Sequence, residues 1–261
     1  MQQPIFQIKN LNLHIKKKSV LSITNFEIHR GITYAIIGQP GSGKTSLLEM
    51  LANQRRPTGG TILYDGDPIS SQDVRRKYQE EVYFLPQVPP PGRRVRGTVE
   101  RYMLKHIRTA PWSTDSAADR LKAVSKRMSL GDKLAREVKT LSPGERRWID
   151  LAICVASDAK VLIIDELEQH MSYDDLDLLK RQLQKKCSYE GTTMLLSTLN
   201  PATIRRLSGV SVTLDHGRIA MIRSVREGSN RGRRVSGGGG DSTRTARGEG
   251  EKTPKAKSFR R

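Results

Sequence analysis

The stretch Ile36-Ile37-Gly38-Gln39-Pro40-Gly41-Ser42-Gly43-Lys44-Thr45 decides how this chain folds. It has the spacing G-x-x-x-x-G-K-[ST], which is the pattern of a loop that binds phosphate groups. The apolar run 33–37 before the loop predicts a buried strand, and apolar residues at helical spacing follow from Ser46 to Leu51. The loop therefore has the strand before it and the helix after it that the pattern requires.

The residues of this loop have separate expected roles. Its glycines let the backbone take up positive φ angles and curl its N–H groups around an anion, which the amino end of the next helix also attracts. We expect Lys44 to reach the β/γ-phosphates of a nucleotide and Thr45 to place its hydroxyl on Mg²⁺. The structural alternative is a glycine-rich turn before a helix. The predicted nucleotide contacts are Gly38, Gln39, Pro40, Gly41, Ser42, Gly43, Lys44, Thr45 and Ser46.

Length and composition narrow the class of protein. The chain has 261 residues, 36% of them hydrophobic, which is enough for a packed core. It contains no run of 18 apolar residues, and residues 1–4 lack the basic and apolar regions of a secretory leader, so we expect neither a membrane span nor secretion. Cys154 and Cys187 have no C-x-x-C spacing, which indicates free thiols in a reducing compartment, with Cys154 in the core.

The net charge of +19 is spread over the chain. Residues 223–261 hold 12 Lys/Arg against 4 Asp/Glu, and residues 1–222 hold 34 against 23. Both parts therefore suggest an anionic partner, either nucleic acid or the inner face of a membrane. The segment 223–261 is rich in Arg, Gly, Ser and Thr and has almost nothing to bury, which predicts a disordered basic tail. Whether this tail binds an anion or only solubilises the chain stays open.

Hydrophobic periodicity predicts alternating strands and helices. Residues 5–15 and 20–28 alternate apolar and polar side chains, which indicates an antiparallel pair. Thr98 to Leu141 has a helical pattern and forms a separate helical lobe in this interpretation. Because strands alternate with helices after this lobe, we expect a parallel core sheet. Further expected strands are 59–66, 82–85, 161–164, 193–197, 210–214 and 218–222, and further expected helices begin at Ser142 and cover 174–189 and 201–207.

The second decisive motif is the apolar strand Val161-Leu162-Ile163-Ile164 followed by Asp165-Glu166. A parallel strand of this kind delivers its last carboxylates to the sheet edge where the phosphate loop also lies. We expect Asp165 to hold Mg²⁺, directly or through water, and Glu166 to act as general base towards the attacking water. The alternative is a strand that ends at a solvated acidic turn.

Between these motifs lies Leu141-Ser142-Pro143-Gly144-Glu145, for which a structural account exists. Ser142 is a suitable N-cap, Pro143 suits the first helical position, and Glu145 completes a capping box. Taken alone, the motif is best interpreted as a helix start.

The order of the motifs along the chain resembles that of the ATP-binding cassette (ABC) ATPases, over roughly residues 5–222. Gly38–Thr45 matches the Walker A motif, Gln87 the glutamine of the Q-loop, Leu141–Glu145 the signature sequence and Val161–Glu166 the Walker B motif. The resemblance implies an α/β fold, that of a P-loop NTPase with a parallel core sheet, an antiparallel β-lobe and an inserted helical lobe. The expected domain covers residues 1–222, with the helical lobe at about 93–141.

The resemblance also implies an activity and partners. It implies an ATPase subunit of a membrane transporter that uses ATP and Mg²⁺ and acts on a separately encoded permease, which docks on the helical lobe. Two copies, or this chain and another ABC ATPase, would pair head to tail, with Ser142 and Gly144 of one subunit closing over the nucleotide of the other. Gln87 would sense metal and γ-phosphate. The expected location is cytoplasmic, peripheral on the inner face of a membrane.

Several residues depart from the pattern of the family. Pro143 replaces a glycine and removes one N–H near the γ-phosphate, and Glu145 replaces the usual glutamine. Residues 169–172 lack the aspartate that contacts the other subunit. The switch histidine is replaced by Leu199, whose alkyl side chain cannot bond a phosphate, and His170 is a candidate substitute. These changes predict weak hydrolysis. The first hairpin offers His14 and Ile15 where the family has an aromatic residue that stacks on adenine.

Two other functions remain open at this point. A soluble ABC ATPase that acts as an ATP-driven switch on nucleic acid or on a protein complex would account for the basic tail. A hydrolysis-poor partner of an intact second ATPase would account for the missing histidine.

Overall fold

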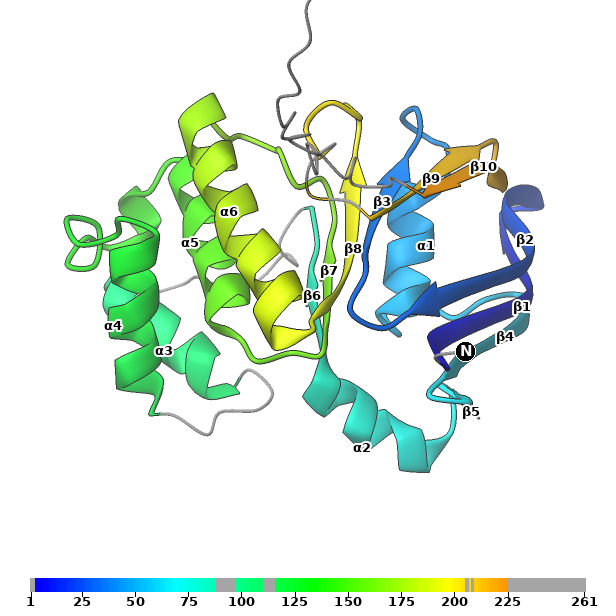
Figure 1. The fold of residues 1–261 in the computed structure, drawn as a ribbon, viewed down its shortest axis with the longest axis horizontal. Coiled ribbons are helices and arrows are strands. Elements are labelled where there is room, and N and C mark those ends of the chain that lie inside the picture. The colour runs from blue at the N-terminus through cyan, green and yellow to red at the C-terminus, as the bar shows by residue number, and fades with distance from the viewer. Residues whose placement is uncertain (1–2, 88–96, 110–115, 205–206, 208, 225–261) are drawn as a thin grey trace, which may run out of the picture. The chain divides into compact units, whose positions relative to one another are not determined.

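The computed structural model describes residues 3–87, 97–109, 116–204, 207 and 209–224, which belong to one compact unit within Met1–Arg226. Residues 225–261 of the expected basic tail and residues 93–96, at the start of the expected helical lobe, lie outside the described residues, whereas Arg223 and Ser224 belong to the last strand. Figure 1 shows two sheets and a group of helices.

The core sheet carries the phosphate-loop strand near its centre. Its order is β10-β9-β3-β8-β7-β6, in which only β10 runs antiparallel to its neighbour. The expected parallel core sheet is therefore confirmed. Its strands are β3 (Thr33–Ile37), β6 (Val82–Leu85), β7 (Val161–Ile164), β8 (Thr193–Thr198), β9 (Val210–Asp215) and β10 (Arg218–Ser224).

The second sheet is antiparallel and forms the predicted β-lobe. Its order is β2-β1-β4-β5, and its long hairpin turns at Lys16 and Lys17, both at positive φ. Burial alternates over parts of each strand of the hairpin, as the pattern predicts, but the buried face changes midway along each strand, and Ile15, expected on the apolar side, is 41% exposed. The strands are β1 (Pro4–Ile15), β2 (Lys18–His29), β4 (Gly59–Tyr64) and β5 (Asp67–Pro68).

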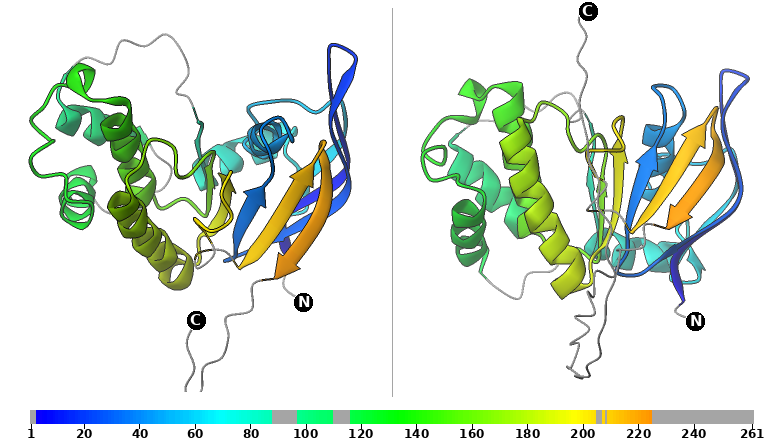
Figure 2. Two further views of the ribbon diagram at one scale, coloured as in Figure 1. Left: turned by 90° about the horizontal axis from the view of Figure 1, so that it is seen from above. Right: turned by 45° about the horizontal axis from the view of Figure 1, so that its top comes forward.

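Helices cover both faces of the core sheet. One hydrophobic cluster joins α1 to both sheets, so that α1 fills the space between them (Figure 1). The other cluster joins the opposite face of the core sheet to α3, α4, α5 and α6, as the views in Figure 2 also show. The helices are α1 (Lys44–Leu51), α2 (Gln72–Glu81), α3 (Val99–Thr109), α4 (Ala117–Arg127), α5 (Pro143–Ala156) and α6 (Tyr173–Glu190), with a 3₁₀ turn, η1 (Val138–Thr140). The inserted helical lobe contains α3 and α4, and Cys154 on α5 is fully buried, as expected.

The sequence interpretation fails in two places. The helix expected at 201–207 is wrong over 201–204, which form turns in which Asn200 accepts the N–H groups of Ala202 and Thr203; residues 205 and 206 lie outside the described ranges. Helix α2 was not expected, since only Val74 and Tyr78 give its ten residues a buried apolar side. The Ser71 side chain caps the start of α2 by accepting the N–H of Val74.

A buried polar contact connects the antiparallel sheet to the rest of the unit. The hydroxyl of Tyr64, on β4, donates to Oε2 of Glu81 at 2.6 Å, and Nζ of Lys160 donates to Oε1 at 2.8 Å. Tyr64 is 0% exposed and Glu81 is 2% exposed, so water cannot reach either group to supply a hydrogen bond in place of this one. The contact joins β4, the end of α2 and the start of β7.

We expect Tyr64→Phe to lower the free energy of unfolding by about 1.5–3 kcal/mol, the usual contribution of a hydrogen bond to a charged group. The matched control is Tyr189→Phe, because Tyr189 is 85% exposed, and its effect should stay within about 0.5 kcal/mol. Urea unfolding followed by circular dichroism measures both. Equal midpoints for the two variants would contradict a stabilising role for this contact.

Candidate functional site

Four loops meet at the carboxyl edge of the core sheet. Residues 38–45 follow β3, Pro86 and Gln87 follow β6, Asp165 and Glu166 follow β7, and Leu199 follows β8. Ile37 pairs with Thr198 and Leu85 pairs with Ile164, so the strands end at nearly the same level. The structure therefore brings the predicted phosphate loop, glutamine and acidic pair together.

The phosphate loop has the backbone that its glycines predict. Gly41 and Gly43 have φ angles of 81° and 101°, in the left-handed region that glycine favours. A Cβ at Gly38 would lie 2.5 Å from the carbonyl oxygen of Leu214 and from Oγ of Ser42. The N-cap of α1 is Gly43, which provides no side-chain cap for the first N–H groups of the helix. These N–H groups suit an anion.

Lys44 extends back over the loop that it follows. Its Nζ donates to the carbonyl oxygens of Gly38 at 2.7 Å and Gln39 at 3.1 Å, and the residue is 5% exposed. Burial lowers the pKa of this ammonium, whereas the nearby charges of Glu166 and Asp165 raise it. The ammonium is thus held beside the acidic turn, at the position expected for a contact with phosphate.

Asp165 is fully buried at the end of β7. The Ser197 hydroxyl donates to its Oδ1, and Oγ of Ser197 also accepts the N–H of Glu166 at 2.7 Å. The other oxygen, Oδ2, is buried and has no hydrogen-bond partner among the described residues. A buried carboxylate oxygen of this kind is costly unless a donor or a cation reaches it.

Glu166 lies next to the predicted glutamine. Nε2 of Gln87 donates to Oε2 of Glu166 at 2.7 Å. Burial raises the pKa of the Glu166 carboxyl, and the negative charge of Asp165 raises it further. A carboxylate with a raised pKa is a stronger base once ionised, which suits the role expected of this residue.

Arg147 is a site residue that the sequence analysis missed. It is 5% exposed, and its guanidinium donates to the carbonyl oxygens of Pro86 at 2.7 Å, Asp165 at 2.6 Å and Glu166 at 3.2 Å. The available signal was a charged residue, five positions after Ser142, within the largely apolar helix α5. Arg147 joins α5 to the loop of Gln87 and to the acidic turn.

The motif at residues 141–145 has the structural role that its residues predict. Ser142 and Glu145 form a complete capping box with Pro143 at the start of α5. Arg136 lowers the pKa of the Glu145 carboxyl to about 2, helped by the N–H of Ser142. A Cβ at Gly144 would lie 2.7 Å from the carbonyl oxygen of His170, so close packing within one subunit requires the glycine. The expected contact of Ser142 and Gly144 with a nucleotide stays a prediction.

The structure also shows where the residues that depart from the family pattern lie. Leu199 directly follows β8 and is 48% exposed. His170 is exposed in the turn after the acidic pair, with φ at 59°. His14 is exposed on β1, and its backbone N–H donates to Oγ1 of Thr58 at 2.7 Å. Substitution of His170 for the switch histidine and stacking of His14 on adenine stay predictions.

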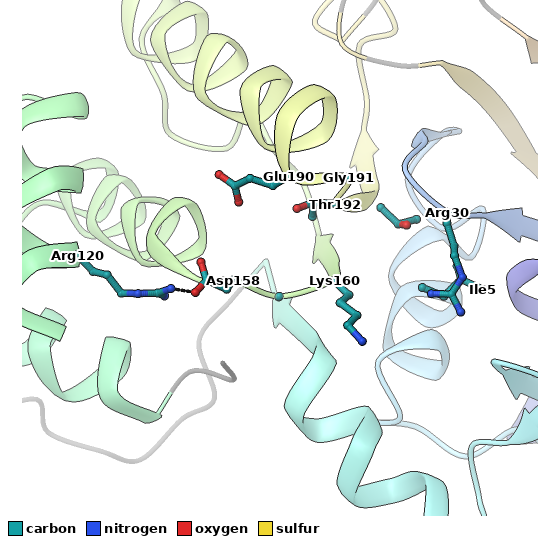
Figure 3. A pocket seen from close by; sticks show the side chains of 10 residues that line it. Ile5, Arg30, Arg120, Asp158, Lys160, Glu190, Gly191 and Thr192 are labelled. Atoms are coloured by element: carbon teal, nitrogen blue, oxygen red, sulfur yellow. Dashed lines mark ion pairs between the residues drawn. The ribbon is translucent and has the colours of Figure 1, made fainter. Parts of the chain in front are cut away.

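The described residues line two cavities besides this site, of which the second reaches the carboxyl end of β6 at Leu85 and Pro86. One, of about 530 Å³, lies at the amino ends of β3, β7 and β8, which form the edge of the sheet opposite the phosphate loop (Figure 3). Its charged side chains bond to other protein groups, among them Arg120 to Asp158 and Lys160 to Glu81. The other is a groove of about 810 Å³ between the end of α1, helix α2, strand β6 and helix α3.

Comparison with known proteins identifies the family. The sequence profile described as "ABC transporter" matches residues 21–169, more than half of the chain. The chain belongs to the ABC transporter family. The predicted fold class, a P-loop NTPase with a parallel core sheet, an antiparallel β-lobe and a helical lobe, is confirmed, because solved ABC ATPase structures share it.

Curated members of the family align with most of the chain. The methionine import ATP-binding protein MetN of Staphylococcus haemolyticus is 28% identical over 79% of this chain and 61% of its own length. The phosphonates import ATP-binding protein PhnC 2 of Albidiferax ferrireducens is 34% identical over 62% of this chain and 63% of its own length. The chain thus spans less than two thirds of the length of these two relatives.

Solved structures of the family share the fold. One described as an ATP-binding subunit of an ABC transporter superposes with a TM-score of 0.75 at 21% identity, covering 85% of this chain and 90% of that one. A dimeric ATP-binding cassette, MJ0796, bound to ADP and Pi, superposes with a TM-score of 0.72 at 17% identity, covering 85% and 99%. Within the described ranges, no helix is long and apolar enough to cross a membrane.

We expect Lys44→Ala to weaken the binding of Mg-ATP by about tenfold to a hundredfold, the equivalent of a lost charged hydrogen bond of about 1.5–3 kcal/mol. Isothermal titration calorimetry measures the affinity, and circular dichroism shows whether the fold persists. Lys139→Ala is the matched control, because Lys139 is exposed beside Glu137 on η1. Equal affinities for parent and Lys44→Ala would contradict the role assigned to Lys44.

Proposed function

We propose that this chain is the ATP-binding and ATP-hydrolysing subunit of a membrane transporter. The observation that carries the proposal is the Asp165 carboxylate, which is fully buried at the sheet edge beside the phosphate loop and has one oxygen that no described residue bonds. The positive charge of Lys44 lies within electrostatic reach of this carboxylate. Membership in the ABC transporter family supports the assignment.

The residues at this edge fit ATP and Mg²⁺. The uncapped amino end of α1 and the ammonium of Lys44 suit the β- and γ-phosphates. Oδ2 of Asp165, the hydroxyl of Thr45 and the side chain of Gln87 would hold the cation, which suits the preference of Mg²⁺ for oxygen ligands. When bound, Mg²⁺ would neutralise charge on the phosphates.

The hydrolytic step would rest on Glu166 and its neighbours. Glu166 would accept a proton from the attacking water, and the hydrogen bond from Gln87 keeps its carboxylate oriented. Leu199 provides no side-chain donor to the γ-phosphate. Loss of one oriented donor costs about 10²–10³ in rate by analogy with oxyanion donors, so we expect slow turnover by the isolated subunit.

A second subunit would complete the site. The amino end of α5, with Ser142 and Gly144, would close over the nucleotide held by the other subunit. There it would attract the γ-phosphate, as helix amino ends attract anions. Pro143 provides no N–H there, which weakens this contact. The family resemblance and the dimeric cassette MJ0796 support such pairing, either of two copies or with another ABC ATPase.

The groove of about 810 Å³ is the surface that we assign to the permease. Its walls combine the rings of Tyr78, Tyr83 and Tyr102 with polar side chains such as Gln79. Apolar walls with a polar rim are common in protein interfaces. The import ATP-binding proteins MetN and PhnC 2 support a role in transport, and the location would be cytoplasmic, on the inner face of a membrane.

We expect steady-state ATPase assays to separate the roles of Glu166 and Leu199. Glu166→Gln should lower turnover by about 10²–10⁴, the usual contribution of a general base. Leu199→His should raise turnover above the parent, because it adds a donor beside the γ-phosphate.

Brisk turnover of the parent that Glu166→Gln abolishes would contradict slow hydrolysis and point to another donor, with His170 first among the candidates. Equal turnover of parent and Glu166→Gln would contradict the base assignment. Glu100→Gln, an exposed substitution on α3 with the same change of charge, is the control.

We expect Gln79→Arg to reduce recovery of a polytopic membrane protein when the chain is extracted in detergent and pulled down. Gln79 is exposed and lines the groove, so a longer charged side chain obstructs a partner there. Gln72→Arg is the control, because Gln72 is exposed on the same helix and does not line the groove. Equal recovery with both variants would show that the groove does not hold the partner.

The same pull-down tests the second candidate function. The 12 Lys/Arg against 4 Asp/Glu in residues 223–261 favour contact with nucleic acid or anionic lipid. Recovery of nucleic acid without a membrane protein would support a soluble ATP-driven switch in place of transport.

A further inference from the structure

A third carboxylate, Glu168, lies at the edge of the sheet two residues after Glu166. Its Oε1 accepts a hydrogen bond from the hydroxyl of Thr198 at 2.6 Å. The same oxygen accepts the backbone N–H of Leu199 at 3.0 Å and, more weakly, that of Asn200 at 3.4 Å. One carboxylate oxygen therefore holds three donors of the turn that follows β8.

The second oxygen of the Glu168 carboxylate does not share the contacts of the first. Oε2 of Glu168 is buried and has no hydrogen-bond partner within the part of the chain that the structure describes. Thr198, which bonds to Glu168, pairs with Ile37 at the end of β3, so the carboxylate lies beside the start of the phosphate loop. Burial lowers the pKa of the Lys44 ammonium, whereas the negative charges of Glu166, Asp165 and Glu168 each raise it.

The sequence explains why the turn depends on Glu168. Leu199 has no polar side-chain group with which to fix its own position, and it is 48% exposed. The turn takes its position from its backbone and from Thr198, and Glu168 is the side chain that bonds to both. Each of these hydrogen bonds to a charged acceptor is stronger than one to a neutral acceptor.

We propose that Glu168 is a positioning residue of the nucleotide site: it fixes the turn at residues 198–200, and its charge makes the binding of ATP depend on a divalent cation. The first part rests on the contacts of the protein alone. The second part rests on the proposed function, because it requires phosphates beside Lys44. Without a cation, the phosphates would face one more negative charge than Asp165 and Glu166 supply.

Hydrogen exchange of the full chain without nucleotide tests the first part. Glu168→Ala should speed exchange at the amide of Leu199 about tenfold or more, because it removes the acceptor of that N–H. The amide of Asn200 should change less, because it also donates to Oγ1 of Thr198 at 3.0 Å. Glu168→Gln keeps an acceptor oxygen of the same reach and should exchange at nearly the rate of the parent. Unchanged exchange at Leu199 in Glu168→Ala would overturn the positioning role.

Calorimetric titration with ATP, once with Mg²⁺ and once with EDTA, tests the second part. Glu168→Gln should bind ATP in EDTA about threefold to tenfold more tightly than the parent, with a smaller change for Mg-ATP. A side chain with only a structural role would not strengthen binding. Glu100→Gln, which has the same change of charge at an exposed site, should match the parent.

The outcomes separate this inference from the proposed function. If the parent binds Mg-ATP and Glu168→Gln shows the same dependence on Mg²⁺, the charge effect is overturned while the function stands. If the parent binds no ATP, the proposed function falls and the charge effect falls with it. In that case the exchange experiment still decides whether Glu168 holds the turn.

Discussion

The candidate site depends on one buried guanidinium. Arg147 donates to the carbonyl oxygens of Pro86, Asp165 and Glu166, which belong to the ends of two neighbouring strands. Among the described residues, Arg147 is the donor to the carbonyl oxygens of Pro86 and Asp165, whereas that of Glu166 also accepts the N–H of Gln169 at 3.2 Å. Loss of the guanidinium would leave the first two carbonyl groups without this donor, which costs free energy. A lysine has a single ammonium and could not reproduce the planar fork that reaches all three. The position of the acidic turn is therefore set from helix α5.

The acidic turn also stores backbone strain. Glu166 and His170 adopt φ angles of 49° and 59°, which are unfavourable for residues with a Cβ. Glycine would relieve the strain at 166 but would remove the carboxylate that bonds to Gln87. The contacts of Ser197 and Arg147 hold the strained turn in place. Strain of this kind is typical of functional sites, where the surrounding structure determines the local conformation.

The sequence predicted the parts of the site that local patterns encode. The strands 33–37, 82–85 and 161–164 have the predicted bounds, because short apolar runs beside motifs mark buried parallel strands clearly. The capping box of Ser142 was also predictable, since its partners lie three residues apart. Arg147 and Glu168 were not, because each bonds to backbone groups far along the chain. Helix α2 has too little apolar periodicity to be recognised.

The close packing of Gly144 against His170 has a mechanical consequence. The carbonyl oxygen of His170 would lie 2.7 Å from a Cβ at residue 144, so the amino end of α5 rests directly on the loop after the acidic turn. Two backbone segments that are in contact, without a flexible side chain between them, cannot approach further. A displacement of one segment is therefore transmitted to the other. A tilt of α5 towards the core would thus displace the 166–172 loop. Because Gly144 lets α5 lie directly against the loop that contains Glu166, the orientation of α5 is coupled to the position of the Glu166 carboxylate.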